Sequence, residues 1–171
     1  ARILDWPGDP MADALKLRIA GGLHALARSG QDSELSELYG TGTGDFATTI
    51  RHILIKWDDW LYPWLNSPPQ TNEVGRSGAL MAGLMVAAKR LAMPIELIEL
   101  GSSAGLNLNL DRFHYVLGSY SGGPVDALVH LKPDWHGAEP DGIWPQIVSR
   151  RGVDQNPLDV GHNAIAERLL A

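Results

Sequence analysis

The sequence predicts an α/β fold, in which a helical N-terminal part (residues 1–70) precedes a sheet-containing part (residues 71–171). Two observations lead to this prediction. Apolar residues recur three or four positions apart through most of the first 92 residues, which is the spacing of helices with one buried face. After Pro94, the run Ile95–Leu100 is short, apolar and rich in strand formers, and it ends at a glycine.

The composition is that of a globular chain, with 171 residues of which 44% are apolar. There is no cysteine, which excludes a disulfide scaffold, a thiolate zinc site and a cysteine nucleophile. The net charge of −6 argues against a general nucleic-acid binder or a protein of anionic membrane surfaces. No apolar run approaches the roughly 18 residues of a transmembrane helix, and no secretory signal is visible. We therefore expect a soluble, cytoplasmic protein.

Three helices are expected in the N-terminal part, over residues 9–29, 32–40 and 45–65. Asp9-Pro10 marks the first start, because proline is preset for the first turn of a helix. The third helix carries three tryptophans on one stripe. We interpret them as core or interface packing rather than as an aromatic ligand box, since each ring buries a large apolar area. Pro68-Pro69 ends this helix.

The second part begins with a helix over residues 73–92, for which Thr71 or Asn72 is the expected cap. The strand Ile95–Leu100 follows after a very short loop, so helix and strand should run antiparallel. From their lengths, the start of the helix should lie near the carboxyl end of the strand. The elements expected further on are a short helix at 106–110 and strands near 113–117, 125–131 and 143–149.

A glycine-containing turn, Gly101-Ser102-Ser103-Ala104-Gly105, joins the strand to the short helix. Glycines let the backbone turn tightly and approach a ligand closely. The start of the helix would offer N–H groups to an anion or carboxylate. Glu99, two residues before the turn, could orient it or bind an ammonium or hydroxyl group. This arrangement is typical of a nucleotide-binding turn.

The turn resembles the first motif of class I S-adenosylmethionine-dependent methyltransferases, an apolar strand with an acid before Gly-x-Gly-x-Gly. Glu99, Leu100, Gly101 and Gly105 match that motif, and Ser103 stands at its middle glycine. The resemblance implies a Rossmann-like, methyltransferase-type sheet, incomplete in this chain, with S-adenosylmethionine as cofactor. It also implies the cofactor-binding residues of the turn, which are Glu99, Gly101, Ser102, Ser103, Ala104 and Gly105.

Asp154 stands where the same family has an acid after its second strand, which holds the ribose hydroxyls of the cofactor. Two acceptor oxygens suit a vicinal diol. Asp154 lies much further from the glycine turn than the usual roughly 20 residues, so residues 111–145 would form an insertion. An ordinary turn at Asp154-Gln155-Asn156-Pro157 is the alternative interpretation.

A longer similarity covers residues 71–159. Its motifs are Thr71-Asn72-Glu73-Val74-Gly75-Arg76-Ser77, Glu99 to Leu108, Asp111-Arg112-Phe113, and Gly152-Val153-Asp154 through Pro157-Leu158-Asp159. Together these segments resemble the bacterial family named only as domain of unknown function 2332. That family is uncharacterised, so the similarity implies little about function. It does imply a longer protein, with sequence on both sides of this chain.

The polar residues near the turn are the remaining candidates for binding a small-molecule ligand or for acting on it. Asn72, Arg76 and Asn107 are candidate substrate-binding residues, and Glu73 and Asp111 are candidate catalytic bases. The alternative makes Asn72 a helix cap, Glu73 a dipole-compensating acid and Arg76 a surface residue. No metal site is expected, because none of the six histidines forms a known metal spacing with carboxylates.

Two other functions stay open beside a methyltransferase. The turn is also a literal G-x-S-x-G, so Ser103 could be the nucleophile of an α/β-hydrolase, with Asp154 or Asp159 as the acid and His162 as the base. The helical character of residues 10–92 argues against this, because a hydrolase nucleophile normally follows several strands. The other alternative is a non-catalytic ligand-binding or regulatory module on a methyltransferase-like fold.

Overall fold

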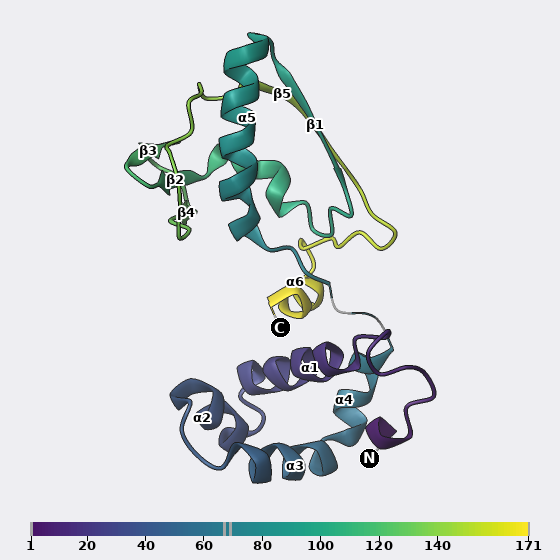
Figure 1. Cartoon of the computed structure of the whole chain (residues 1–171). Helices are drawn as coiled ribbons and strands as arrows, with labels where there is room; N and C mark the ends of the chain where they lie inside the picture. The colour runs from purple at the N-terminus through teal and green to yellow at the C-terminus, as the bar shows by residue number, and fades with distance from the viewer. Residues whose placement is uncertain (1, 67, 69, 171) are drawn as a thin grey trace. The chain divides into compact units, whose positions relative to one another are not determined.

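In the computed structural model, the chain forms two compact units. The described residues are 2–66, 68 and 70–170. Residues 1–70 and 160–171 form the first unit, and residues 71–159 form the second. Helices make up the first unit and small sheets occur in the second (Figure 1), which confirms the mixed α/β class. The expected second region ran to residue 171, whereas the structure groups the last helix with the N-terminal helices.

The first unit is helical throughout its regular elements. These are η1 (a 3-10 segment, Arg2–Asp5), α1 (Leu15–Ser29), α2 (Ser33–Thr41), α3 (Phe46–Lys56), α4 (Asp58–Leu65) and α6 (Asn163–Leu170). The expected start of the first helix at Asp9-Pro10 is wrong. The Asp9 carboxylate accepts hydrogen bonds from the amides of Met11 and Ala12 and caps a turn, and Ala14 at φ 51° separates that turn from α1.

The single helix expected over residues 45–65 is also wrong, because α3 and α4 meet at a break. Trp57 lies at this break, outside helical geometry, with φ −111° and ψ 23°. Its indole Nε1 donates to the Asp32 carboxylate at 2.9 Å, and α4 contacts α1 after the break. A tertiary hydrogen bond thus accompanies the end of a helix that local spacing alone would continue. Pro69, half of the expected Pro68-Pro69 stop, lies outside the described residues.

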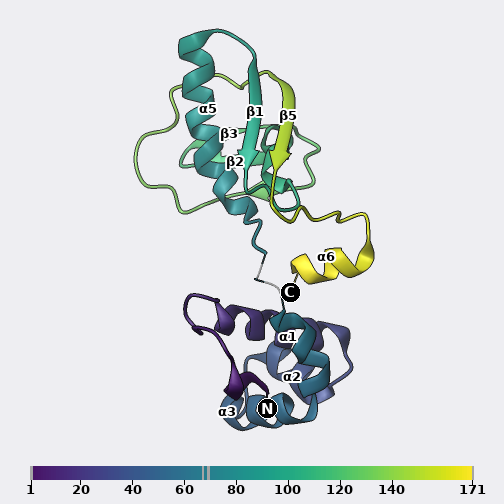
Figure 2. The same ribbon diagram turned by 90° about the vertical axis from the view of Figure 1, so that its right-hand side faces the viewer.

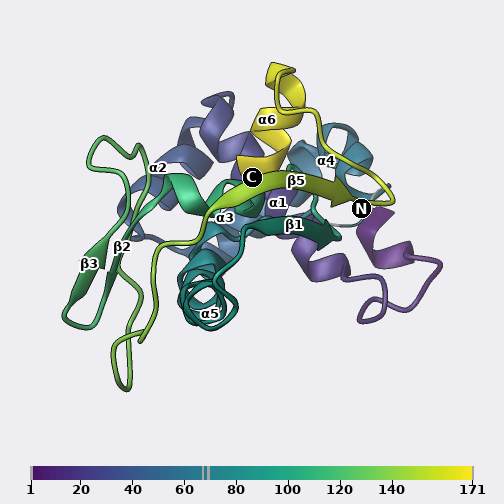
Figure 3. The same cartoon turned by 90° about the horizontal axis from the view of Figure 1, so that it is seen from above.

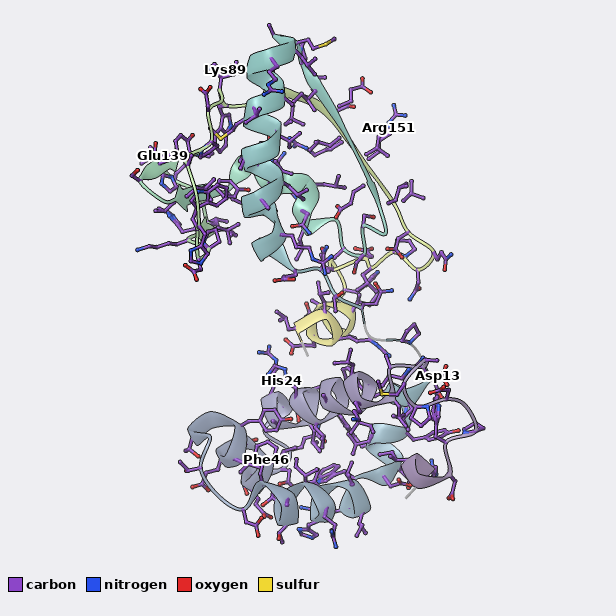
Figure 4. The ribbon with its side chains drawn as sticks, viewed as in Figure 1. Asp13, His24, Phe46, Lys89, Glu139 and Arg151 are labelled. Atoms are coloured by element: carbon purple, nitrogen blue, oxygen red, sulfur yellow. The ribbon has the colours of Figure 1, made fainter. Side chains whose placement is uncertain are left out.

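The core of the first unit is apolar and comes from α1 to α4. Its buried members are Leu23, Leu26, Ala27, Leu35, Leu38, Ile53 and Leu61. Trp57 and Trp60 pack against it, which confirms the packing interpretation for these two tryptophans. At one edge Tyr39 stacks on His24, with ring centroids 5.7 Å apart, and contacts Phe46; Figure 4 labels His24 and Phe46.

Asp32 is a buried acid with several hydrogen-bond donors around it. It is 3% exposed, caps α2 through the Leu35 amide, and accepts from Lys56 Nζ at 2.6 Å and from the Trp57 indole. Burial alone raises its pKa, but the hydrogen bonds from Lys56, Trp57 and Leu35 outweigh burial and hold the pKa at about 2. The carboxylate therefore joins α2 to the junction of α3 and α4.

Asp32→Ala should lower the free energy of unfolding of the first unit by about 2 kcal/mol at neutral pH, since the helix cap and the ion pair with the half-exposed Lys56 are both lost. Because the folded-state pKa is depressed, this stabilisation is complete above pH 3.8 and is lost as the pH falls toward about 2. Urea unfolding at several pH values checks both statements. Glu37→Ala, an exposed site on α2, is the control; equal losses in the two variants would contradict the account.

The second unit contains one long helix, two 3-10 segments and two small sheets. They are η2 (Val74–Arg76), α5 (Ser77–Leu91), β1 (Ile95–Leu100), η3 (Leu106–Arg112), β2 (His114–Leu117), β3 (Tyr120–Gly122), β4 (His130–Leu131) and β5 (Ile147–Val153). The strand at 95–100 is confirmed. The strand expected near 125–131 shrinks to β4, because Val125 and Leu128 are exposed, and the one expected at 143–149 begins and ends later, as β5.

β1 and β5 are parallel neighbours, and their register runs from Ile95↔Ile147 to Leu100↔Val153. Figure 2 shows the two strands side by side with both arrows pointing the same way, and Figure 3 shows the pair from above. The segment between them carries the other sheet, of order β3-β2-β4. Parallel pairing therefore brings together two strand ends that lie more than 50 residues apart in the sequence.

The two faces of the β1–β5 pair differ. Leu97 joins the core with Met81 and Met85 of α5 and with Tyr115 and Leu117 of β2. On the opposite face, Ile98 and Leu100 are 67% and 79% exposed. Arg151, the register partner of Ile98, points away from α5 in Figure 4. The covered face thus holds the core, and the open face stays in contact with solvent.

Candidate functional site

The candidate site lies where β1 and β5 end together. Leu100 and Val153 are register partners, so Gly101 and Asp154, the residues that follow them, lie at the same edge of the sheet. The Gly101 amide donates to the Val153 carbonyl at 2.7 Å, and the Ser102 amide donates to it at 3.3 Å. Ligands of open α/β sheets bind at this carboxyl edge. The structure therefore places the glycine turn beside Asp154, an acid more than 50 residues further along the chain.

Asp154 holds the glycine turn through its carboxylate. Oδ2 accepts from the Ser103 amide at 2.7 Å, and Oδ1 accepts from the Asn156 amide at 2.8 Å. These hydrogen bonds, that from Asn156 first, lower the pKa of Asp154, so the side chain is ionised at neutral pH. A carboxylate has about four lone-pair positions, which leaves Asp154 able to accept two further hydrogen bonds. Asp154 both shapes the loop and can still bind a ligand.

The turn takes a left-handed backbone at alternate residues. Gly101, Ser103 and Gly105 have φ angles of 72°, 51° and 69°. Ser103 thus adopts a conformation that favours glycine, at the position where the methyltransferase motif has its middle glycine. No atom lies within 4 Å of where a Cβ on Gly101 would be, so the backbone is open there. The loop geometry is that of a glycine turn despite the serine.

Asn72 links the start of the long helix to this turn. Its Oδ1 accepts from the Leu106 amide at 2.8 Å. The expectation that Thr71 or Asn72 caps a helix beginning at residue 73 is therefore corrected for Asn72, since α5 starts at Ser77 after the 3-10 segment η2. The Leu106 amide, expected to be open to an anion, is used by Asn72. The contact does confirm that the helix start lies near the carboxyl end of β1.

Glu73 and Arg76 form an exposed pair on η2 and its flank. Arg76 Nε lies 3.3 Å from Glu73 Oε2, and the two side chains are 65% and 67% exposed. Exposed pairs of this kind contribute little to stability. Burial raises the pKa of Glu99, and the positive charge of Arg76 partly opposes that rise. Neither residue lines the cavity at the strand ends.

Asp111 is held under the covered face of the sheet. Its Oδ2 accepts from Arg150 Nη2 at 2.8 Å, and the side chains of the two residues are only 18% and 26% exposed. Arg150 is the register partner of Leu97, in the middle of β5. Asp111 therefore lies away from the strand ends, in an ion pair that nothing in the sequence pattern indicated.

A cavity of about 400 Å³ opens at the strand ends. Its lining residues are Leu100, Gly101, Val153, Asp154 and Gln155. Three of them, Leu100, Val153 and Gln155, were not predicted as site residues; their sequence signal is that they flank Gly101 or Asp154. The volume lies in the range of small-molecule sites, and one acid and one amide, Asp154 and Gln155, stand among apolar groups and backbone. This arrangement can accept hydrogen bonds from a ligand with vicinal donors.

Glu99 and Asn107 lie on the other side of the turn, in a polar chain. Ser77 Oγ donates to Asn107 Oδ1 at 2.7 Å, and these two residues are 0% and 5% exposed. Asn107 in turn hydrogen-bonds the Glu99 side chain, whose pKa burial raises. Sequence reasoning did not single out Ser77 as a site residue. The available signal was a serine that follows a predicted helix start instead of preceding it.

Ser103→Gly should raise the free energy of unfolding of the second unit by about 1 kcal/mol, because glycine adopts a positive φ without steric cost. The Ser103 hydroxyl adds to the effect, since it is buried without a hydrogen-bond partner among the described residues. Ala104→Gly is the control: it only adds freedom to the unfolded chain and should destabilise. Thermal unfolding of both variants checks this. A destabilised Ser103→Gly protein would show that the serine side chain is needed for the loop.

The same serine bears on the hydrolase interpretation. Ser103 is 5% exposed, and Asp154 binds its backbone amide. We expect no labelling of the full chain by a fluorophosphonate probe at Ser103, since a nucleophile must be reachable. Labelling that disappears in Ser103→Ala would restore the hydrolase interpretation.

No group of three or more histidine, aspartate or glutamate side chains within the described ranges could hold a metal ion. His114 uses both ring nitrogens, on the Pro124 carbonyl and on Ser121 Oγ, and His136 contacts Asp134. Among the residues that the structure describes, no helix is long and apolar enough to cross a membrane.

A family model described as "Uncharacterized protein conserved in bacteria (DUF2332)" matches residues 1–171. The match extends beyond residues 71–159, from which the resemblance was drawn. No curated protein and no solved structure matches the chain.

Proposed function

We propose that this chain, which belongs to the bacterial DUF2332 family, binds S-adenosylmethionine at the carboxyl ends of β1 and β5 and acts as a methyltransferase or a cofactor-binding relative. The arrangement would be the first part of a Rossmann-like, methyltransferase-type sheet. One observation carries the proposal: parallel pairing of β1 with β5 places the Asp154 carboxylate on the Ser103 amide of the glycine turn, at 2.7 Å.

The residues at the strand ends fit this cofactor. Asp154 is ionised and has acceptor positions left for the two ribose hydroxyls. Gly101 leaves open space where a side chain would stand, so the backbone can approach a ligand closely. Leu100 and Val153 supply apolar surface beside the acid. When bound, the sulfonium would supply an electrophilic methyl group.

A role without turnover is the second candidate, and the cavity lining favours it. Asp154 is the only titratable side chain among the lining residues, and two backbone amides already hold it as an acceptor. Glu73 and Asp111, the candidate bases, do not line this cavity. Methyl transfer to an acidic acceptor would thus need a base from elsewhere. Binding of the cofactor without turnover would distinguish a sensor or carrier from an enzyme.

Equilibrium dialysis of tritiated S-adenosylmethionine against the full chain tests the proposal. S-adenosylhomocysteine and adenosine should displace the label, whereas 2′,3′-dideoxyadenosine should not, because it lacks the hydroxyls that Asp154 would accept. Absence of binding would overturn the proposal. Equal displacement by adenosine and the dideoxy compound would show that Asp154 does not bind the ribose hydroxyls.

A further inference from the structure

A second cavity, of about 310 Å³, lies between α5, β1 and η3. Seven of its nine lining residues are aliphatic, and the other two, Glu99 and Asn107, are polar. The aliphatic residues are Leu80, Leu84, Leu97, Ile98, Leu100, Leu108 and Leu110. The side chains of Ile98 and Leu100 lie on the open face of β1, so the other five supply the apolar surface of the cavity. Such a site, apolar with a few fixed polar groups, is the usual form of a small-molecule pocket. It shares only Leu100 with the cavity at the strand ends.

The polar end of this cavity is fixed by the hydrogen-bond chain that starts at Ser77. The Ser77 hydroxyl donates to Asn107 Oδ1, which turns the Asn107 amide nitrogen toward its other partner. That partner is Glu99. Burial raises the pKa of Glu99, and the hydrogen bond from Asn107 opposes that rise, as a donor to a carboxylate does. Each hydrogen bond thus points from Ser77 toward Glu99, and Glu99 accepts.

One carboxylate oxygen of Glu99 has no hydrogen-bond partner within the described part of the chain. Oε2 is buried and lacks a hydrogen-bond partner. Buried polar atoms without a partner are rare and often mark a bound group. When Glu99 is ionised, Oε2 can only accept, so its missing partner is then a donor. Arg76, the nearby cation, forms an ion pair with Glu73. Glu99 is the acidic side chain among the residues that line the cavity.

We propose that this cavity binds a small apolar amine, with the ammonium group on Glu99 Oε2 and the hydrocarbon part among the leucines. A positive charge suits a carboxylate that is partly removed from water, and hydrogen bonds between charged groups are the strong ones. The aliphatic lining excludes a second charged group at the other end of the ligand. This site does not depend on the proposed cofactor, because its charged group is Glu99 and not Asp154, and the two cavities share only Leu100.

Titration of the full chain with benzylamine, benzyl alcohol and benzoate tests the charge requirement, since the three probes share a ring and differ in the polar group. Ligand-observed NMR should give benzylamine an affinity at least about tenfold higher than benzyl alcohol, and benzoate the weakest binding. Equal affinities, a reversed order, or no binding by any of the three would overturn the proposal.

Two variants locate the site. Glu99→Gln should remove the preference for benzylamine over benzyl alcohol, while Glu96→Gln, on the opposite face of the same strand, should keep it. Leu84→Trp should fill the cavity and abolish binding of both probes, with circular dichroism confirming that the chain stays folded. A preference for benzylamine that survives Glu99→Gln, or benzylamine binding that survives Leu84→Trp, would show that the amine binds elsewhere.

Discussion

Gly152→Ala is expected to lower the free energy of unfolding of the second unit by about 2 kcal/mol, the range of an overpacked core position. A Cβ on Gly152 would lie 2.5 Å from Ser102 Oγ and 2.8 Å from Ser102 Cβ. Rotation of the hydroxyl relieves the first contact but not the second. Ser102 is 5% exposed and is held by its amide on Val153, so the strand ends must separate. Ligand binding at the glycine turn should be lost with it.

Gly83→Ala is the matched control for this change. Gly83 lies inside α5, and nothing is within 4 Å of where its Cβ would be. Alanine is a better helix former than glycine, so Gly83→Ala should stabilise the unit by about 1 kcal/mol. Urea unfolding of the two variants checks both signs. A Gly152→Ala protein as stable as the wild type would contradict the close approach of β5 to the turn.

Asp154→Ala should release the glycine turn while β1 and β5 stay paired. The Ser103 amide loses its acceptor, so its hydrogen exchange should become at least about tenfold faster. The exchange of the Gly101 amide should change little, because it donates to the Val153 carbonyl. Since the folded-state pKa of Asp154 is lowered, this protection is present above pH 3.8 and is lost as the pH falls through the lower folded-state value.

Asp126→Ala provides the comparison for that measurement, because Asp126 is an exposed aspartate of the same unit. Its Ser103 amide should exchange as in the wild type. Slow exchange of Ser103 in Asp154→Ala would mean that the loop is held by other contacts.

The strand, the turn and the acid of the site were predictable from sequence because their signals are local. Ile95–Leu100 is an apolar run that ends in glycine, and Gly101 and Gly105 adopt the positive φ that glycine allows. Asp154 follows a strand and precedes a turn in the sequence, as it does in the structure. Each of these signals depends on residues within a few positions of each other.

What the sequence did not show depends on contacts between distant residues. The break between α3 and α4 accompanies the hydrogen bond from Trp57 to Asp32, 25 residues earlier. The Asp111–Arg150 pair joins η3 to β5 across 39 residues. The sequence pattern therefore gave no sign of this partner, and Asp111 was interpreted as an acid without one. The Ser77–Asn107 hydrogen bond spans 30 residues. From the sequence alone, Ser77 was interpreted as part of the first turns of a helix. Periodicity and motifs carry no information about such pairs.

Calorimetric titration of S-adenosylhomocysteine into the full chain tests the central claim most directly. The account predicts binding to the wild type and to Asp126→Ala, and at least about a 100-fold weaker affinity for Asp154→Ala. Absence of heat from a folded wild-type protein would contradict cofactor binding at the ends of β1 and β5. Equal affinities for the wild type and Asp154→Ala would contradict the role of Asp154 in that site.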